Sequence, residues 1–227
     1  LEEIDNWQCC GGVFTTSNDE LATKLSSVRA LVEADKKGQP LVSVCSACHN
    51  VLKQTNQMMK DASIPASAHV NNYIAPESYN GQTEVIHYLE LLRDKIGFDK
   101  IKEKVVNPLT GKKVAAYYGC LLLRPGKVMA MDDVENPTIM EDLIRALGAE
   151  PVIYAYRNEC CGGYITLESK DLAKAKSQKV TSNAKEKGAE VIVTACPLCL
   201  YNLKKNGSEI PVVYITELLA QALGIKE

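Results

Sequence analysis

The sequence predicts an α/β protein that contains two copies of one unit, each with a small, mostly parallel sheet flanked by helices. Two observations lead to this prediction: short apolar strands alternate with helical stretches, and a pair of cysteine motifs recurs at a fixed spacing. Strands that alternate with helices are typical of parallel α/β units. The clearest runs of buried-strand type, apolar and rich in β-branched residues, are Val114–Tyr118, Val152–Tyr156, Val191–Thr194 and Val212–Ile215.

Helices are predicted between these strands from their end signals. Pro137–Leu147 follows Asn136, a favourable capping residue, and stops before Gly148. Ser169–Lys187 has helical spacing and ends near a second glycine. The second half of the chain therefore carries a regular alternation of strand and helix.

The cysteine motifs show that the chain is a duplication. The doublet Cys9–Gly12, with sequence Cys-Cys-Gly-Gly, recurs as Cys160–Gly163, and the Cys-x-x-Cys motif Cys45–Cys48 recurs as Cys196–Cys199. Both recurrences are offset by 151 residues, so the same length of chain separates the doublet from the second motif in each half. An internal repeat of this kind indicates two structural units.

The repeat also predicts where the units differ and where they meet. Later matches are offset by less than 151 residues, which places an insertion of 24 residues in the first half, within Gln54–Gln82. The turn-rich segment Asn107–Gly111 is the predicted boundary, giving one unit over residues 1–106 and another over 107–227.

The second half has a fifth cysteine, Cys120, which follows a predicted strand and precedes the doublet. The first half has no counterpart, and the chain begins at Leu1 without an initiator methionine. We expect the N-terminal part of the first unit to be missing, with its fifth thiol about 30 residues before Leu1.

Composition restricts the functions that the chain can have. It has 227 residues, 46% of them hydrophobic, enough for one large core or two small ones. Because the 26 basic residues give no excess over the 28 acidic ones, we expect no nucleic-acid binding. No apolar run reaches membrane-spanning length and no signal peptide opens the chain, so we expect no membrane span and a cytoplasmic protein.

The nine cysteines indicate metal or redox chemistry. Each Cys-x-x-Cys motif directly follows a predicted buried strand and precedes a helix, where backbone N–H groups favour thiolates. A structural zinc ion takes four ligands, fewer than the five thiols of the second half. The spacing alone favours iron–sulfur clusters, with zinc and redox-active disulfides as alternatives.

Taken together, the motifs resemble the cysteine-rich CCG domain, and most of all the B subunit of heterodisulfide reductase. The shared pattern is Cys-x39-Cys-Cys-Gly-x34-Cys-x-x-Cys, complete in the second half and lacking its first cysteine in the first half. The segments that carry the resemblance besides the doublets are Asn107–Leu109, Ala115–Cys120, Ala195–Cys199 and Ile210–Tyr214. The resemblance implies two Rossmann-like CCG domains.

The resemblance also implies cofactors and ligands. In this family each motif binds a non-cubane [4Fe-4S] cluster through five thiolates. The first cluster would be held by Cys9, Cys10, Cys45 and Cys48, without a fifth ligand here. The second would be held by Cys120, Cys160, Cys161, Cys196 and Cys199.

The implied activity is reduction of the mixed disulfide of coenzyme M and coenzyme B, or a related disulfide, to two thiols. The implied partners are the ferredoxin-like iron–sulfur subunit and the flavin-containing subunit of heterodisulfide reductase. A separate electron source also follows from the sequence, because it has no Gly-x-Gly-x-x-Gly motif for a nicotinamide or flavin.

Three further residues are candidates for catalysis. His49 adjoins Cys48 and would supply a proton to a leaving thiolate; the alternative is a helix-start histidine with no chemical role. Arg124 and Lys127 follow Cys120 and would pair with an anionic group of the substrate; the alternative is a solvated loop.

Two other functions stay open at this point. The chain would be an electron-transfer CCG component of another complex, such as thiol:fumarate reductase or a hydroxyacid or glycerol-3-phosphate dehydrogenase. Alternatively it would be a zinc-binding structural module.

Overall fold

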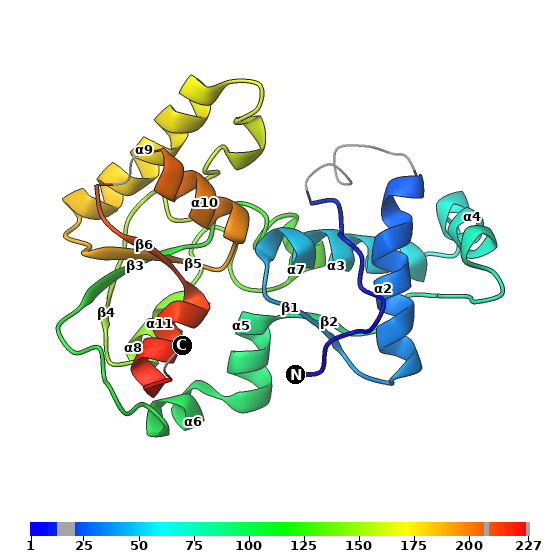
Figure 1. Cartoon of the computed structure of the whole chain (residues 1–227), viewed down its shortest axis with the longest axis horizontal. Coiled ribbons are helices and arrows are strands. Elements are labelled where there is room, and N and C mark those ends of the chain that lie inside the picture. The colour runs from blue at the N-terminus through cyan, green and yellow to red at the C-terminus, as the bar shows by residue number, and fades with distance from the viewer. Residues whose placement is uncertain (13–20, 207–208, 226–227) are drawn as a thin grey trace. The chain divides into compact units, whose positions relative to one another are not determined.

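The computed structural model describes residues 1–12, 21–206 and 209–225. It divides into two compact units (Figure 1): Leu1–Tyr88 with Lys127–Met129, and Leu89–Gly126 with Ala130–Glu227. We call these the first and the second unit and describe each by itself. The division at residues 106 and 107 stays a prediction from the sequence.

The first unit is a parallel strand pair with helices. Its elements are η1 (Leu21–Lys24), α2 (Leu25–Lys36), β1 (Leu41–Ser43), α3 (Ser46–Lys60), α4 (Pro65–Ile74) and β2 (Val85–His87). β1 and β2 are parallel, with Leu41 opposite Val85 and Ser43 opposite His87. α5 (Tyr88–Glu90) and α7 (Gly126–Met129) each contain residues of both units.

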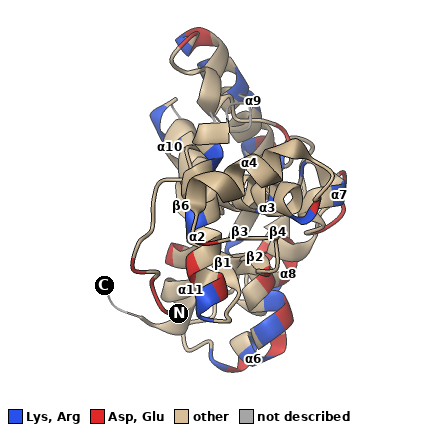
Figure 2. Cartoon of the chain, turned by 90° about the vertical axis from the view of Figure 1, so that its right-hand side faces the viewer, with Lys and Arg blue, Asp and Glu red and all other residues tan. Residues whose placement is uncertain are grey.

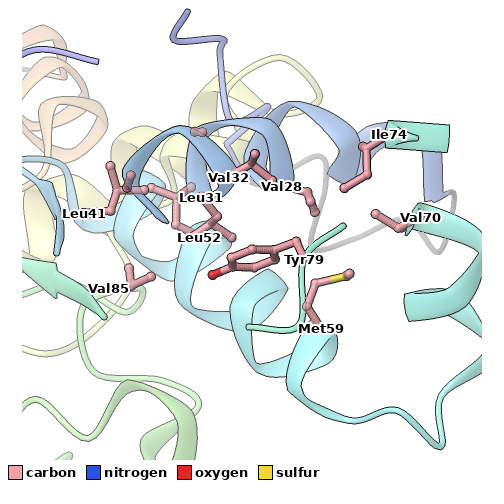
Figure 3. Close-up of a cluster of buried hydrophobic side chains, with 12 residues drawn as sticks. Val28, Leu31, Val32, Leu41, Leu52, Met59, Val70, Ile74, Tyr79 and Val85 are labelled. Atoms are coloured by element: carbon pink, nitrogen blue, oxygen red, sulfur yellow. The ribbon is translucent and has the colours of Figure 1, made fainter. Parts of the chain in front are cut away.

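The core of the first unit lies between α2, α3, α4 and the strands. Figure 3 shows Tyr79 between side chains of α2 and α3, with Met59 beside it. Tyr79 and Leu31 have no exposed surface, and the Tyr79 hydroxyl is hydrogen-bonded to Asn56. Burial of these apolar side chains, each worth about 1.5–3 kcal/mol, holds α3 in place, and α3 carries one cysteine motif.

The second unit is a four-stranded parallel sheet in the order β4-β3-β5-β6. Its elements are η2 (Leu91–Ile96), α6 (Phe98–Glu103), β3 (Lys113–Tyr117), α8 (Ile139–Ala146), β4 (Glu150–Val152), η3 (Gly163–Ile165), α9 (Lys170–Glu186), β5 (Val191–Thr194), α10 (Pro197–Lys205), β6 (Val212–Tyr214) and α11 (Ile215–Leu223). β5 is buried at every position, as predicted from its unbroken apolar run.

The predicted fold class is confirmed: the chain is α/β, with two small parallel sheets flanked by helices. One predicted strand is wrong in its extent, because β4 ends at Val152 and does not continue to Tyr156. After Val152 the backbone forms hydrogen bonds outside the β4 ladder: Ala155 N donates to the Asn183 side chain, and Arg157 O accepts from Tyr118 N. The apolar run therefore continues as a loop.

The structure also places the extra residues of the first half. Ser43 and Thr194, which end β1 and β5, are offset by 151 positions, whereas Val85 and Val212, which begin β2 and β6, are offset by 127. The difference is taken up by a longer α3 and the additional α4, since α3 has 15 residues and α10 has nine.

Over the ranges that the structure describes, no helix has the length and apolar character needed to cross a membrane.

Candidate functional site

The two Cys-x-x-Cys motifs occupy the same junction in both units, where a buried strand passes into a helix. Cys45 precedes α3 and Cys196 precedes α10, both with extended backbone. The carbonyl oxygen of each accepts the first intrahelical hydrogen bond, from His49 N at 2.8 Å and from Leu200 N at 2.9 Å. The motif's second cysteine then lies in the first helical turn, where the helix dipole favours negative charge.

In the first unit the doublet reaches the Cys-x-x-Cys motif. Cys10 Sγ lies 3.1 Å from Cys48 Sγ, and Cys48 also has a hydrogen bond to Cys45. Gly12 N donates to Cys10 Sγ at 3.4 Å and Gly11 N donates to Cys9 Sγ at the same distance. The hydrogen bond with Cys48 lowers the pKa of Cys10 to about 7, and the same contact raises the pKa of Cys48.

In the second unit five thiols form one continuous chain of contacts. Its order is Cys120, Cys160, Cys161, Cys199 and Cys196. The Cys161 and Cys199 sulfurs are 3.6 Å apart, and Gly162 N donates to Cys160 Sγ at 3.3 Å. The hydrogen bond with Cys120 is the main cause that lowers the pKa of Cys160 to about 2. The hydrogen bonds of Cys120 with Cys160 and of Cys199 with Cys161 raise the pKa of Cys120 and of Cys199.

Two glycines make room for these sulfurs. A Cβ atom on Gly119 would lie 3.2 Å from Cys199 Sγ, and one on Gly163 would lie 3.4 Å from Cys161 Sγ. Gly119 also has φ +65°, a conformation that side chains disfavour. The backbone therefore approaches the thiols closely at both points, and a larger residue at Gly119 would crowd Cys199.

A buried amide holds the doublet of the second unit. Asn202 Nδ2 donates to Cys161 O at 2.7 Å and to Ser177 Oγ at 3.0 Å, and Ser177 Oγ donates to the same carbonyl oxygen at 3.1 Å. Sequence reasoning missed both residues. Comparison of the two halves could have identified Asn202, because the equivalent position, 151 residues earlier, is the apolar Val51.

A buried ion pair holds the segment that precedes the same doublet. Arg157 Nη1 lies 2.5 Å from Glu141 Oε1, and these side chains are only 6% and 1% exposed. The Tyr118 hydroxyl is hydrogen-bonded to the other oxygen of Glu141, and the Arg157 carbonyl oxygen accepts from Tyr118 N and Gly119 N. The pair therefore links the segment before Cys160 to the end of β3, and no pattern in the sequence predicts it.

The three predicted catalytic residues lie in different surroundings. His49 is buried in α3 with its ring 5.4 Å from that of His87, and burial together with the charge of His87 lowers its pKa to about 2. Arg124 Nη1 donates to Asn158 O at 2.9 Å, and Nη2 lies 3.1 Å from Glu135. Lys127 is exposed on α7, in the part of that helix that belongs to the first unit. The catalytic roles of these residues stay predictions.

The donor set of both sites is sulfur alone, which suits iron–sulfur clusters and zinc. None of the nine cysteines, all of which the structure describes, forms a disulfide. Within residues 1–12, 21–206 and 209–225 no three His, Cys, Asp or Glu side chains converge so as to hold one metal ion. The five linked thiols are more ligands than a single zinc ion takes.

Comparison with known proteins gives consistent matches. The model of a cysteine-rich domain family, CCG, matches residues 1–53 and 114–204. The 8-methylmenaquinol:fumarate reductase membrane anchor subunit of Wolinella succinogenes is 32% identical over 99% of this chain and 82% of its own length. The B subunit of the ferredoxin:CoB-CoM heterodisulfide reductase of Methanosarcina mazei is 30% identical over 98% of this chain and 78% of its own length. A hypothetical protein from Helicobacter pylori shares the fold, with a TM-score of 0.73 and 10% identity over 97% of this chain and 42% of that chain.

Proposed function

Because this chain belongs to the CCG cysteine-rich domain family, we propose that it is the iron–sulfur subunit of an oxidoreductase that reduces a disulfide to two thiols. The observation that carries the proposal is the run of five contacting thiols in the second unit, matched in the first by contacts of Cys48 with Cys10 and with Cys45. Relatives in this family are subunits of heterodisulfide reductases and of a fumarate reductase.

We assign the thiols as ligands of two [4Fe-4S] clusters of the non-cubane type. Cys9, Cys10, Cys45 and Cys48 would hold the first, and Cys120, Cys160, Cys161, Cys196 and Cys199 the second. When bound, such clusters supply electrons one at a time. The chain's own part is to provide thiolates, which the helix N-termini and the doublet N–H groups favour, and to exclude bulk solvent from the buried Cys161, Cys196 and Cys199.

The reaction adds two electrons and two protons to one S–S bond and releases two thiols. The natural substrate is proposed to be the mixed disulfide of coenzyme M and coenzyme B or a related disulfide, with electrons from a ferredoxin-like subunit and a flavin-containing subunit. Arg124 and Lys127 would bind the substrate's anionic group. His49 is neutral at physiological pH because its pKa is lowered, so it would contribute a neutral imidazole N–H.

A second function is favoured by the relative from Wolinella succinogenes. There the chain would transfer electrons within a fumarate reductase complex and would not act on a disulfide itself. This alternative uses the same clusters, so spectra alone do not separate it from disulfide reduction.

Anaerobic purification followed by two assays tests both functions. We expect about eight iron atoms with matching sulfide in a chain whose two sites are both filled. We also expect reduction of coenzyme M–coenzyme B disulfide by reduced viologen dye, abolished in Cys161→Ser. An iron-loaded protein that does not turn over this disulfide, but supports fumarate reduction with its partner, favours the second function. A protein that contains zinc without iron contradicts both.

A further inference from the structure

We propose that the surface formed by η3, α9 and α10 of the second unit binds a small acidic electron-carrier protein. We call this surface the basic face and define it by Tyr164, Leu167, Leu172, Lys176, Tyr201 and Lys205, all exposed. The partner's role as an electron carrier rests on the proposed function, whereas its acidic character rests on the charges described next.

Positive charge is concentrated on these helices although the whole chain is slightly acidic. α9 contains five lysines against two acidic residues, and α10 contains two lysines and no acidic residue. The complete chain has 26 basic and 28 acidic residues. All seven lysines are exposed, and Figure 2 shows the blue positions along α9 and α10. Separation of charge on this scale steers an oppositely charged partner and speeds its association.

Exposed apolar side chains lie among these lysines. Leu167 is 100% exposed, and Tyr164, Leu172 and Tyr201 are between 50% and 57% exposed. η3, α9 and α10 contact one another, and Leu167 lies in the short connection between η3 and α9. Aromatic and apolar groups surrounded by charge are typical of a protein interface, and scattered solvated lysines would not require them.

The basic face adjoins the thiols directly. A Cβ atom on Gly162 would lie 3.1 Å from Lys176 Cδ, and one on Gly163 would lie 3.1 Å from Leu198 Cγ, so α9 and α10 both cover the doublet loop. Tyr164 has a hydrogen bond to Cys160. A protein bound to this face would therefore contact residues that touch the sulfur atoms.

The chemistry favours an acidic protein over an anionic lipid surface. Glu168 and Asp171 are exposed within the region, and α9 is strongly polar, with no continuous apolar stripe on its exposed side. A membrane-bound amphipathic helix needs that stripe to face outward. A small transient interface with a charged rim is typical of electron-transfer complexes.

The test measures binding, without turnover, of the complete chain to an oxidised acidic bacterial ferredoxin by isothermal titration calorimetry. In the double variant Lys176→Glu, Lys205→Glu we expect the Kd at low ionic strength to rise at least about tenfold, and the difference to shrink as salt is added. The matched control is Lys100→Glu, Lys102→Glu, which reverses two exposed lysines of α6, a helix without cysteines. We expect its Kd to stay within about twofold of the wild type.

A second variant tests the apolar part of the face. Leu167→Ser with Leu172→Ser should weaken binding while leaving its salt dependence unchanged, because no charge is altered. Circular dichroism confirms that each variant is folded.

Three outcomes would overturn the inference. They are no ferredoxin binding by the wild type at low salt, equal loss of binding in the α6 control, and binding to vesicles of anionic phospholipid that is lost in Lys176→Glu, Lys205→Glu while ferredoxin binding is kept. Iron content measured on the same samples separates this inference from the proposed function. An iron-loaded protein that does not bind ferredoxin contradicts only the proposed binding at the basic face. An iron-free protein that binds ferredoxin through these lysines contradicts only the proposed cluster function.

Discussion

In the second unit the carbonyl oxygen of Cys161 accepts hydrogen bonds from Asn202 and Ser177, whereas in the first unit the position equivalent to Asn202 is Val51, which cannot donate one. The equivalent of His49 is Leu200, and the equivalent of His87, counted from the start of β2 and β6, is Tyr214. Duplication therefore preserved the sulfur atoms and the strand–helix junctions, while the groups around them diverged. We expect the two sites to differ in stability and electronic properties even with the same ligands.

The largest expected effect on stability concerns the buried ion pair between Glu141 and Arg157 in the second unit. Glu141→Leu removes one partner and leaves Arg157 charged and buried, which should lower the free energy of unfolding by about 3–5 kcal/mol. Chemical denaturation measures this change. The exposed pair between Lys185 and Glu209 is the control, and Lys185→Ala should change stability by less than about 1 kcal/mol. Equal effects at the two pairs would contradict the structural importance of Glu141.

The next largest effect is expected when Asn202 and Val51, which occupy equivalent positions in the two units, are each replaced by the other residue type. Asn202→Val should lower the free energy of unfolding by about 1–3 kcal/mol, because Cys161 O and Ser177 lose a buried partner. The variant should also release iron from the second site faster under a chelator, as followed by visible absorption. The reciprocal Val51→Asn should not slow iron release from the first site. If Asn202→Val releases iron at the wild-type rate, the amide does not support the doublet.

A smaller effect is expected from Gly119→Ala. A residue with a side chain at φ +65° lowers the free energy of unfolding by about 1–2 kcal/mol. The new methyl group would also lie 3.2 Å from Cys199 Sγ, closer than ordinary contact. Gly111→Ala is the matched control, since its φ is +78° and no atom lies within 4 Å of the added Cβ. Both variants should therefore be destabilised, Gly119→Ala more than Gly111→Ala, and only Gly119→Ala should change the absorption or EPR spectrum of the second site. Identical spectra would show that Gly119 does not limit the space beside the sulfur.

The smallest effect belongs to the inserted segment, which only the first unit has. Asp61 Oδ1 accepts a hydrogen bond from Ser63 N at 3.0 Å, and the hydrogen bonds from Ser63 lower the pKa of Asp61. The folded state therefore gains stability from this carboxylate above its ordinary pKa, and loses it as the pH falls through the lowered value. Thermal unfolding of wild type and Asp61→Asn should differ slightly at pH 6 and converge in strong acid. A difference that grows as the pH falls would contradict this assignment.

Much of the fold and of the site could be predicted from sequence because the signals were local. An unbroken apolar run indicates a buried strand, and a cysteine directly after it must lie at the strand's carboxyl end, as Cys196 does after β5. The end of β4 could not be predicted, since Ile153 and Tyr154 are as apolar as strand residues and only the hydrogen bonds of the folded chain exclude them.

The supporting groups were missed for a related reason. Glu141 and Arg157 are 16 residues apart, and Asn202 lies 41 residues after the carbonyl group that it holds. Pairs so far apart in sequence have no periodicity, and a buried charge is visible only once the chain has closed around it. Position 202 was the exception, because the repeat offered Val51 for comparison.

The hydrogen bonds from Asn202 and Ser177 end on the main chain of Cys161 and leave its sulfur untouched. The turn is consequently held through its main chain, independently of the contacts of the sulfur atom. A selenocysteine, which differs from cysteine by one atom, would keep the same turn, so this unit offers a scaffold in which sulfur can be exchanged for selenium at one ligand position.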